Sequence, residues 1–411
     1  MENNKTPSIR FKGFTDPWEQ RKLGDNIVEY KGKTTINNQY PVLTSSRRGI
    51  FFQTDYYDGN QIASVDNTGY NIVPYGFFTY RHMSDDEIFH FNINDITENG
   101  IVSTLYPVFT TDENLDSRYL QYQLNYGKEF SKYAILQKQG GSRTYMYLNK
   151  LKELRLTIPN SVEEQKKIST YFMKLDSLIT LHQRKYDKLQ NIKKYMLEKM
   201  FPKNGSNVPE IRFSGFTDPW EQRKLNELVI IERGGSPRPI DKFITNDANG
   251  LNWVKIGDAP QQGNYITKTA EKIIPEGLSK TREVHPGDLI LSNSMSFGKP
   301  YIMAINGCIH DGWLLIRDTN KVFDLKFLCQ MLGIEQMLSQ YKALAAGSTV
   351  NNLNKELVGN TNVKIPNIKE QQQIGDYFAN LDNLITLHQR EWKGKRIWII
   401  INCLLNTIKN G

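Results

Sequence analysis

The residue types that carry catalysis are present in this sequence, but none stands at a spacing that would build an active site. The six histidines, at positions 82, 90, 182, 285, 310 and 388, form no metal-ligand spacing. Gly32-Lys33-Thr34 resembles the end of a phosphate-binding loop, but Ile27 occupies the position where that loop needs glycine. No serine or cysteine sits in a nucleophile elbow. The sequence therefore predicts a non-catalytic chain that binds no metal ion and no cofactor of its own.

The chemistry that the sequence does offer is hydrogen bonding and positive charge on Gly-rich loops. Arginine can read guanine with two hydrogen bonds, asparagine and glutamine can read adenine, and hydroxyl and backbone N–H groups hold phosphates. Each loop on its own is more typical of a solvated turn than of a DNA contact. Such loops, however, recur at matching places in the two halves of the chain. The candidate DNA-binding residues are Ser45, Ser46, Arg47, Arg48, Arg81, Lys138, Gln139, Arg143 and Tyr145 in the first half, and Arg233, Ser236, Arg238, Ser292, Asn293, Ser294, Ser348, Thr349 and Asn351 in the second.

An internal repeat organises the elements that must position these loops. The 15-residue segment that begins at Ile9 returns at Ile211 with 14 identical positions, and the ten residues from Leu175 return at Leu381 with nine identical. Weaker matches lie between these anchors. The chain therefore consists of two units of about 205 residues joined head to tail. Two copies of one frame favour a scaffold that is used twice.

The inserts between the repeated segments differ. Residues 24–140 and 226–346 share almost no sequence, whereas the frames around them are nearly identical. Drift after duplication would blur frame and insert alike, so we expect each insert to recognise a different target. Short β-rich runs such as Ile72–Tyr80 and Asp288–Ser292, and helical periodicity at Leu115–Tyr126 and Leu325–Tyr341, predict mixed α/β domains.

Each unit ends in a long predicted helix. No glycine or proline interrupts Val162–Phe201, and Ser161 is placed to cap this helix. Apolar residues alternate spacings of three and four, which is typical of a coiled-coil seam. Periodicity does not choose between a parallel and an antiparallel pair. The seam positions are Ile168, Phe172, Leu175 and Ile179 in the first helix and Ile374, Phe378, Leu381 and Ile385 in the second.

His182 and His388 fall within this seam, at equivalent positions of the repeat. A histidine in such a place can ligate a metal ion or move a proton, or it can be a buried, hydrogen-bonded imidazole between helices. No cysteine, aspartate or second histidine stands at ligand spacing along the chain. We therefore interpret both as structural residues.

The composition is that of a globular protein with a basic surface. The 411 residues carry 52 Lys+Arg and 44 Asp+Glu, a net charge of +8, which permits a nucleic-acid partner. Three cysteines without CxxC spacing argue against a disulfide framework and against a cysteine zinc site. No apolar run is long enough to span a membrane, and the first residues have no apolar signal core. We expect a cytoplasmic protein.

The repeated segments resemble those of one family. The frame IRFxGFTDPWEQRKL, a variable domain, and then LNK, IP, EQ and LDxLITLHQR resemble the specificity (S) subunit of type I restriction-modification enzymes, over essentially the whole chain. The resemblance implies an α+β fold with two target-recognition domains and two long helices that form an antiparallel coiled coil, related by a pseudo-twofold internal repeat. The expected segments are 1–159 and 206–366 for frame plus recognition domain, and 160–205 and 367–411 for the helices.

The resemblance also implies partners. In that family each recognition domain binds one half of a bipartite site in the major groove of double-stranded DNA. Two adenine-N6 methyltransferase subunits, which use S-adenosylmethionine, dock on the helices, and two restriction subunits, which use ATP and Mg, can join them. The S subunit contributes specificity and no catalysis.

Two alternatives remain open from the residues alone. A coiled-coil scaffold whose inserts bind proteins or glycans would show no sequence-selective DNA binding. A stand-alone DNA-binding regulator would bind DNA without a methyltransferase, although no helix-turn-helix is evident. One departure from the family pattern is clear: the two units stop matching after Arg390, and we expect Gly394 to interrupt the second helix.

Overall fold

A computed structural model describes residues 7, 9–60, 62–138, 143–203, 205–293, 298–345 and 353–405, with the backbone alone at 393 and 395–405. The chain divides into two compact units. Unit 1 comprises residues 1–181 and 392–411, and unit 2 comprises residues 182–391. Each long helix therefore contributes residues to both units, and the predicted segment boundaries stay a prediction.

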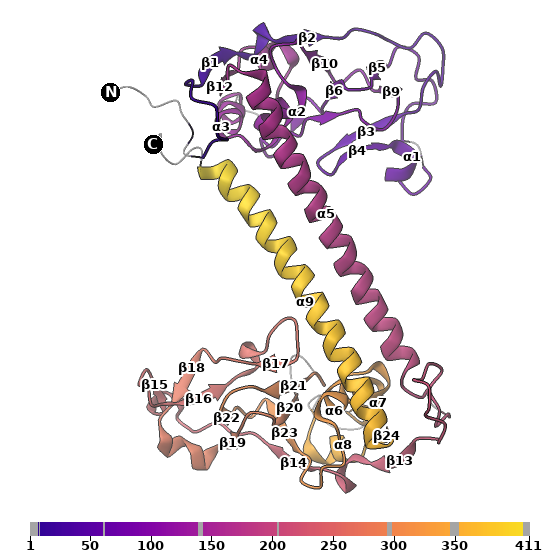
Figure 1. Cartoon of the computed structure of the whole chain (residues 1–411), viewed down its shortest axis with the longest axis vertical. Coiled ribbons are helices and arrows are strands. Elements are labelled where there is room, and N and C mark those ends of the chain that lie inside the picture. Colours follow the sequence, from indigo (N-terminus) through magenta and orange to yellow (C-terminus); the bar gives the residue numbers. More distant parts are fainter. Residues whose placement is uncertain are drawn as a thin grey trace. The chain divides into compact units, whose positions relative to one another are not determined.

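Unit 1 is built from short antiparallel strands with helices packed beside them (Figure 1). Its main sheet has the order β2-β10-β6-β8, and four two-stranded sheets pair β1 with β12, β3 with β4, β5 with β9 and β7 with β11. Its elements up to the first long helix are β1 (Glu19–Lys22), β2 (Ile27–Glu29), β3 (Leu43–Ser46), β4 (Gly49–Phe52), α1 (Gln53–Tyr56), β5 (Asn71–Pro74), β6 (Phe78–Thr79), β7 (Met83–Ser84), β8 (Asn92–Ile93), β9 (Asn99–Val102), β10 (Val108–Thr111), α2 (Ser117–Tyr126), α3 (Lys128–Leu136), β11 (Thr144–Tyr145), α4 (Leu148–Lys152) and β12 (Arg155–Ile158).

Unit 2 carries two five-stranded sheets, β14-β23-β20-β21-β17 and β15-β18-β16-β22-β19. Its elements up to the second long helix are β13 (Glu221–Lys224), β14 (Ile230–Arg233), β15 (Ile244–Thr245), β16 (Leu251–Val254), β17 (Tyr265–Ile266), β18 (Glu271–Ile273), β19 (Arg282–Val284), β20 (Leu289–Ser292), β21 (Pro300–Met303), β22 (Gly307–Ile309), β23 (Trp313–Arg317), α6 (Leu325–Leu332), α7 (Glu335–Ala345), α8 (Lys355–Gly359) and β24 (Asn362–Ile365).

The two inserts share a sheet that their sequences do not reveal. In unit 1 the four main strands stand in the order first, fourth, second, third along the chain, and all neighbours are antiparallel. In unit 2 β14, β23, β20 and β21 have the same order and the same directions. The two domains therefore use one strand topology, and they differ in the loops and added strands around it.

The repeated frame closes on itself in the same way in both units. Its first strand pairs antiparallel with the strand that leads into the long helix: β1 with β12, and β13 with β24. In unit 1 two guanidinium nitrogens of Arg10, Nε and Nη2, donate to the buried carboxylate of Glu164, at 2.6 and 2.7 Å. The indole of Trp18 donates to the same carboxylate. Burial of the charged pair is tolerated because the two-pronged geometry gives the carboxylate two strong hydrogen bonds.

Unit 2 repeats this arrangement residue for residue. Nε and Nη2 of Arg212 donate to the buried carboxylate of Glu370 at 2.7 and 2.8 Å, and the Trp220 indole donates to it as well. These contacts explain why Arg, Trp and Glu stand at matching positions of the repeat. The turn that the Asp-Pro-Trp motif forms thus ties the start of each unit to the base of its long helix.

The glutamine that follows each of these glutamates connects the frame to the insert. Gln165 accepts a hydrogen bond from the backbone N–H of Asp116, and Gln371 accepts one from Asp324, at 2.8 and 2.9 Å. Both aspartates are the N-caps of the helices that begin at Ser117 and Leu325. The base of each long helix therefore fixes the first helix after the variable sheet.

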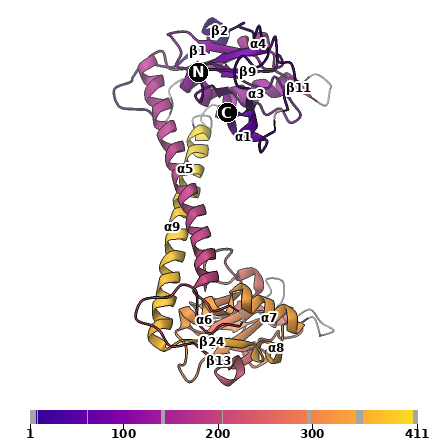
Figure 2. The ribbon, with the colours of Figure 1, turned by 90° about the vertical axis from the view of Figure 1, so that its right-hand side faces the viewer.

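The long helices are α5 (Val162–Lys199) and α9 (Ile368–Leu405). Side chains of Ser161 and Asn367 accept hydrogen bonds from the first turns, which confirms the predicted cap at Ser161. Within unit 2 the C-terminal part of α5 packs against the N-terminal part of α9 in the opposite direction, as Figures 1 and 2 show. Lys193 of α5 bonds Asp382 of α9 at 2.6 Å, and His182 contacts His388. Residue numbers rise on one helix as they fall on the other, so the pair is antiparallel.

The predicted seam residues occupy two different environments. Those of α9 are buried in the main core of unit 2, together with Tyr186, Leu189 and Met196 of α5. In α5 Ile168 packs on the core of unit 1, and the ring of Phe172 lies 5.2 Å from that of Tyr122 in α2. The first turns of the predicted seam therefore pack on the insert of unit 1.

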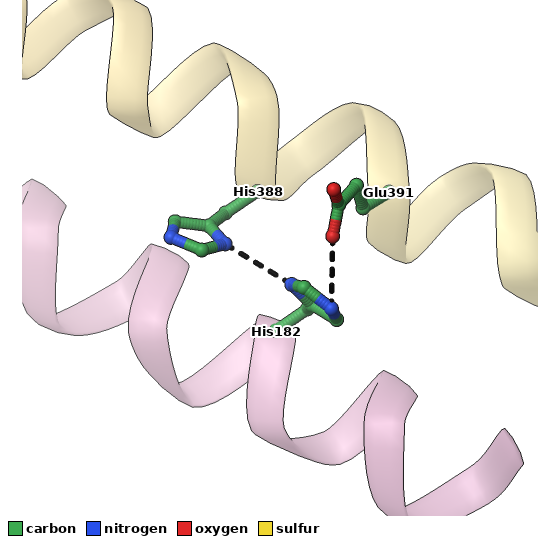
Figure 3. Close-up of side chains that lie close together, drawn as sticks. All are labelled: His182, His388 and Glu391. Carbon is green, nitrogen blue, oxygen red and sulfur yellow. Dashed lines mark hydrogen bonds and ion pairs between the residues drawn. The ribbon is translucent and has the colours of Figure 1, made fainter.

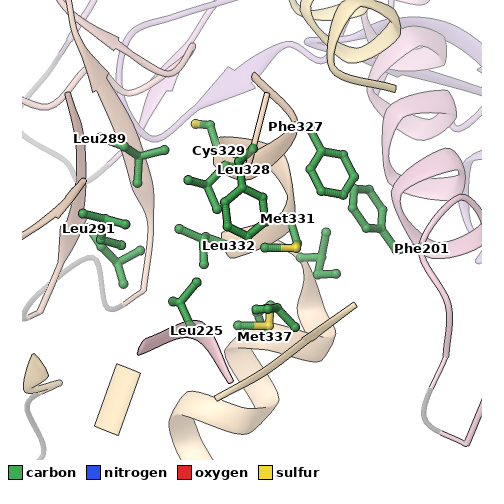
Figure 4. Close-up of a cluster of buried hydrophobic side chains, with 14 of the residues drawn as sticks. Phe201, Leu225, Leu289, Leu291, Phe327, Leu328, Cys329, Met331, Leu332 and Met337 are labelled. Carbon is green, nitrogen blue, oxygen red and sulfur yellow. The ribbon is translucent and has the colours of Figure 1, made fainter. Parts of the chain in front are cut away.

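The main core of unit 2 joins the frame, the insert and both helices (Figure 4). Phe201, just after α5, stacks on Phe327 of α6 and on Phe378 of α9. Leu225 of the frame and Leu289 of β20 lie in the same cluster. Because all of these groups exclude water together, the insert and the helix pair of unit 2 form one packed body.

Two expectations about the helices are wrong. Gly394 does not interrupt α9, which continues from Ile368 to Leu405, because one glycine in a helix costs only about 1 kcal/mol. The helical pattern at Leu325–Tyr341 covers two helices, α6 and α7, which separate at Gly333. Among the described residues, no helix has the length and apolar character that a membrane crossing requires.

Candidate nucleic-acid interface

Three of the predicted DNA-binding cations of unit 1 meet at one acidic segment, residues 85–87. Arg47, at the tip of the β3–β4 hairpin, donates to Asp86 at 2.8 Å. Arg143, which precedes β11, donates to Asp85 at 2.8 Å, and Lys138, which follows α3, forms an ion pair with Glu87. The fold thus brings three loops that are distant in the sequence to one place.

The geometry of these ion pairs favours strong hydrogen bonds, but the pairs contribute little to stability because solvent reaches them. The hydrogen bonds from Arg47 and then from Ser84 hold the pKa of the Asp86 carboxyl well below its usual range. The same pairing raises the pKa of the Arg47 guanidinium. All three pairs are largely open to solvent, where such pairs contribute little to stability and are screened by salt. A phosphate or a base edge can therefore replace each carboxylate.

Aromatic rings stand beside these cations. The Tyr145 and Tyr147 rings stack at 5.9 Å, and the Tyr147 ring stacks on His82 at 4.9 Å. Both tyrosines are exposed, as is the candidate Arg81. Arg48 lies over the ring of Tyr56, 4.5 Å from its centre. Tyr145 is a candidate from the sequence, whereas Tyr147, which stands two residues further on as the N-cap of α4, is not.

In unit 2 the Gly-rich loop at 233–238 is fixed by Asp311. The backbone oxygen of Asp311 accepts from Arg233 and from Asn293, and its carboxylate accepts from Ser236 at 3.0 Å. A Cβ at Gly234 or Gly235 would lie 2.2 or 2.3 Å from a backbone oxygen of a neighbouring segment. Glycine is therefore required here for close backbone packing, and the loop presents the exposed Arg238 from a fixed base.

Three of the predicted contact residues lack an exposed side chain, and their contact with DNA stays a prediction. Ser45, Ser292 and Asn293 are buried, and their side chains hold neighbouring backbone. Ser46 is half-buried and closes the β3–β4 hairpin through Gly49. Polar residue type alone did not distinguish these supporting groups from exposed ones. Five further candidates lie outside the described residues: Gln139, Ser294, Ser348, Thr349 and Asn351.

The two interfaces are chemically different. Unit 1 offers exchangeable cations with stacked aromatic rings, and unit 2 offers arginines on a rigid Gly-rich loop. Both combine guanidinium groups with hydroxyl and amide groups that set their position, which is the chemistry of base and phosphate recognition.

Comparisons with known proteins find the same family in both halves of the chain. The model of the type I restriction modification DNA specificity domain matches residues 15–191 and again residues 217–393. The type I restriction enzyme MjaVIII specificity subunit of Methanocaldococcus jannaschii is 23% identical over 398 residues, covering 92% of this chain and 88% of that protein. The putative MjaX specificity subunit of the same organism is 22% identical over 284 residues, covering 67% of this chain and 64% of that one.

Solved structures share the fold. The S subunit of a type I restriction-modification system from M. genitalium has a TM-score of 0.59 at 13% identity, with 98% of each chain covered. A chain from a study of complex assembly and conformational transition of the type I R-M system has a TM-score of 0.50 at 16% identity, covering 95% of this chain and 96% of that one.

Proposed function

Since the chain belongs to the family that carries the type I restriction modification DNA specificity domain, we propose that it reads a bipartite DNA site, one half with each unit. The duplicated domain supports this directly. Two units have the same main sheet and the same frame contacts, but their loops present different groups. Two different readers on one scaffold are suited to an asymmetric site with two unlike halves.

The exposed face of each long helix supports the docking of two copies of one partner. Leu178 and Leu181 of α5 are exposed, and so are Leu384 and Leu387, their equivalents in α9. Residues three apart on a helix share a face, so each pair forms a small apolar patch. We assign these patches, the Leu178 and Leu384 patches, to two methyltransferase subunits.

The partners bring the chemistry. The chain itself acts through hydrogen bonds and charge, and it positions a methyltransferase that uses S-adenosylmethionine on a target adenine. Restriction subunits that use ATP and Mg join the same complex. This chain thereby contributes specificity to reactions that its partners carry out.

A domain replacement tests the two-reader proposal. The chain is expressed with its cognate methyltransferase, residues 24–140 are replaced by the equivalent insert of another family member, and the methylated motif is determined by methylome sequencing. We expect one half of the motif to change and the other half, with the spacing, to stay. A change in both halves would overturn the proposal.

The docking proposal is tested on the Leu384 patch. The double substitution Leu384→Lys with Leu387→Lys places charge in a desolvated contact, so the complex should retain one methyltransferase copy, measured by native mass spectrometry. Gln372→Lys with Gln373→Lys adds the same charge at two exposed positions about three turns before this patch on α9 and should retain two. Two copies in both variants would show that the partner docks elsewhere.

A further inference from the structure

His182 and His388, which the repeat makes equivalent, meet each other between the two helices (Figure 3). Their Nδ1 atoms lie 3.0 Å apart, and the ring centres are 5.3 Å apart. A pair of equivalent residues in contact is what a twofold-like packing of two repeats requires. The contact brings two imidazoles together from positions 206 residues apart in the sequence.

Glu391 adds a carboxylate to this pair. It follows His388 by three residues on α9, so the two side chains share a helix face. Its Oε2 lies 2.9 Å from Nε2 of His182. One potential ligand atom from each of the three residues lies within 4.8 Å of the other two. In the described part of the chain no other group of histidine, cysteine or acidic side chains meets this condition.

We propose that His182, His388 and Glu391 bind one divalent transition-metal ion of the zinc class. Two imidazoles and one carboxylate form a common protein ligand set for zinc, and imidazole nitrogen suits zinc, cobalt, nickel and copper far better than magnesium or calcium. Zinc–nitrogen bonds of about 2.0–2.1 Å with tetrahedral angles place two nitrogens about 3.3 Å apart. The observed Nδ1 separation of 3.0 Å is therefore within a few tenths of an ångström of that needed.

Metal binding requires no change in the number of protons on the two imidazoles. In the metal-free pair one Nδ1 carries the hydrogen that the other accepts. When both Nδ1 atoms face a metal ion, each ring carries its proton on Nε2. In the metal-free chain Oε2 of Glu391 lies against Nε2 of His182, so the Glu391 side chain must turn toward the Nδ1 atoms to ligate the ion. His182 is nearly enclosed, whereas Glu391 is 40% exposed, so the carboxylate lies on the side from which an ion and a completing water can enter.

The repeat explains why only one such ion is expected. The position equivalent to Glu391 in the first unit is Lys185, which supplies no ligand at neutral pH. Glu391 is also the first residue after the shared Leu-His-Gln-Arg segment, where the match between the two helices ends. The divergent end of α9 thus begins with the group that completes a site for a cation.

A bound ion would hold α5 to α9 at this level of unit 2. Because the ion binds the folded chain and not the unfolded chain, it adds to the free energy of unfolding. At saturation this gain rises with the logarithm of the free ion concentration. This role does not depend on the proposed DNA reading, because the site lies on the helices and uses none of the candidate DNA-binding residues.

The experiment uses the full chain, treated with a chelator and then titrated with Co²⁺ and with Zn²⁺. We expect one Co²⁺ per chain with visible ligand-field absorption, displacement by Zn²⁺, and a rise of about 5 °C in Tm at saturating Zn²⁺. Each of His182→Gln, His388→Gln and Glu391→Gln should weaken binding at least tenfold. His285→Gln removes an exposed histidine beside two acidic residues and serves as the matched control, with unchanged binding.

Circular dichroism of each metal-free variant verifies that the helices form, so that lost binding is not confused with unfolding. Absence of Co²⁺ absorption in the folded wild-type chain would overturn the proposal and leave a hydrogen-bonded histidine pair. Equal binding by wild type and by a His182→Gln, His388→Gln double variant would overturn it as well, because the ion would then lie elsewhere.

Discussion

At the scale of single residues, the acidic segment 85–87 determines how the cations of unit 1 are held. Arg47, Lys138 and Arg143 each bond one of its three carboxylates. If these cations bind DNA as proposed, a phosphate has to displace the carboxylates, because both compete for the same guanidinium donors. We therefore expect the acidic segment to weaken non-specific binding.

Substitution of Arg143 tests its role as a reader. We expect Arg143→Ala to relax or abolish one half-site, at a cost of about 1–3 kcal/mol if the guanidinium reads a base edge. Binding to cognate and scrambled duplexes is measured across a salt series. An equal loss on both duplexes with a shallower salt dependence would assign Arg143 to a phosphate instead.

Asp85→Asn is the matched partner of that substitution. It removes the carboxylate that Arg143 bonds and leaves the arginine in place, so affinity for all duplexes should rise. A fall in affinity would mean that Asp85 positions Arg143 for reading, because the amide cannot replace the charge of the carboxylate.

The two long helices carry equivalent aspartates, Asp176 in α5 and Asp382 in α9, which have different partners. Asp382 has Lys193 as its ion-pair partner, whereas Asp176 accepts a hydrogen bond from the Tyr122 hydroxyl. Burial raises the pKa of Asp176, although the bond from Tyr122 opposes this shift. The folded chain then binds a proton more tightly than the unfolded chain, so this residue lowers stability as pH rises through the raised pKa.

Asp176→Asn should therefore raise Tm at pH 7, and the gain should shrink as the pH falls through the raised pKa toward the unfolded-state value of about 3.9, because the wild-type carboxyl becomes protonated in the folded chain. Asp382→Asn, the equivalent change, should lower Tm, because it removes the charge that Lys193 pairs. Thermal melts of both variants between pH 4 and pH 8 give the comparison. A Tm loss for Asp176→Asn at pH 7 would contradict the desolvation argument.

At the scale of elements, each long helix begins at a buried charge. Glu370 accepts two hydrogen bonds from Arg212 with no exposed side-chain surface of its own. Glu370→Gln leaves the Arg212 guanidinium without a counter-charge, so we expect a loss of about 3–5 kcal/mol in unfolding free energy. Asp376→Asn on the same helix breaks the exposed pair with Lys326 and should cost less than about 1 kcal/mol. Urea titrations of both variants measure the difference, and equal losses would contradict it.

These elements also show where sequence reasoning succeeded and failed. The frame, its helix cap at Ser161 and the long helices were predictable because each follows from local pattern and from repetition. The common sheet of the two inserts was not predictable, because strand order depends on pairings between distant segments that use different side chains. Likewise the histidine pair was judged by spacing along the chain, whereas its members come from two helices that pack in opposite directions.

The candidate interface was predicted in part for a similar reason. Arginines on exposed loops were found by residue type, and Arg47 and Arg143 do lie together. Ser45 and Asn293 have the same polarity but are buried, because a folded loop needs internal hydrogen bonds as well as exposed ones. The acidic segment that gathers the cations carried no DNA-binding signal, since opposite charge is the reverse of what such a search seeks.

At the scale of the whole molecule, the two long helices are part of both units, and we expect their length to set the spacing between the two half-sites. In unit 2 His182 lies opposite His388, and Lys193 lies opposite Asp382. Lengthening one helix alone shifts one of these contacts out of register. Lengthening both helices between the two contacts preserves the two contacts.

We therefore predict the outcome of four-residue insertions after Gln190 in α5 and after Asn383 in α9, both exposed positions. Four helical residues add about 6 Å, and DNA rises 3.4 Å per base pair, so the doubly extended chain should methylate a motif whose spacer is one or two base pairs longer. The α5 insertion alone should lower Tm, because it separates Lys193 from Asp382 or His182 from His388. Methylome sequencing reads the spacer and thermal melts read the pairing. An unchanged spacer in an active, doubly extended chain would mean that the helices serve for docking and do not measure the DNA.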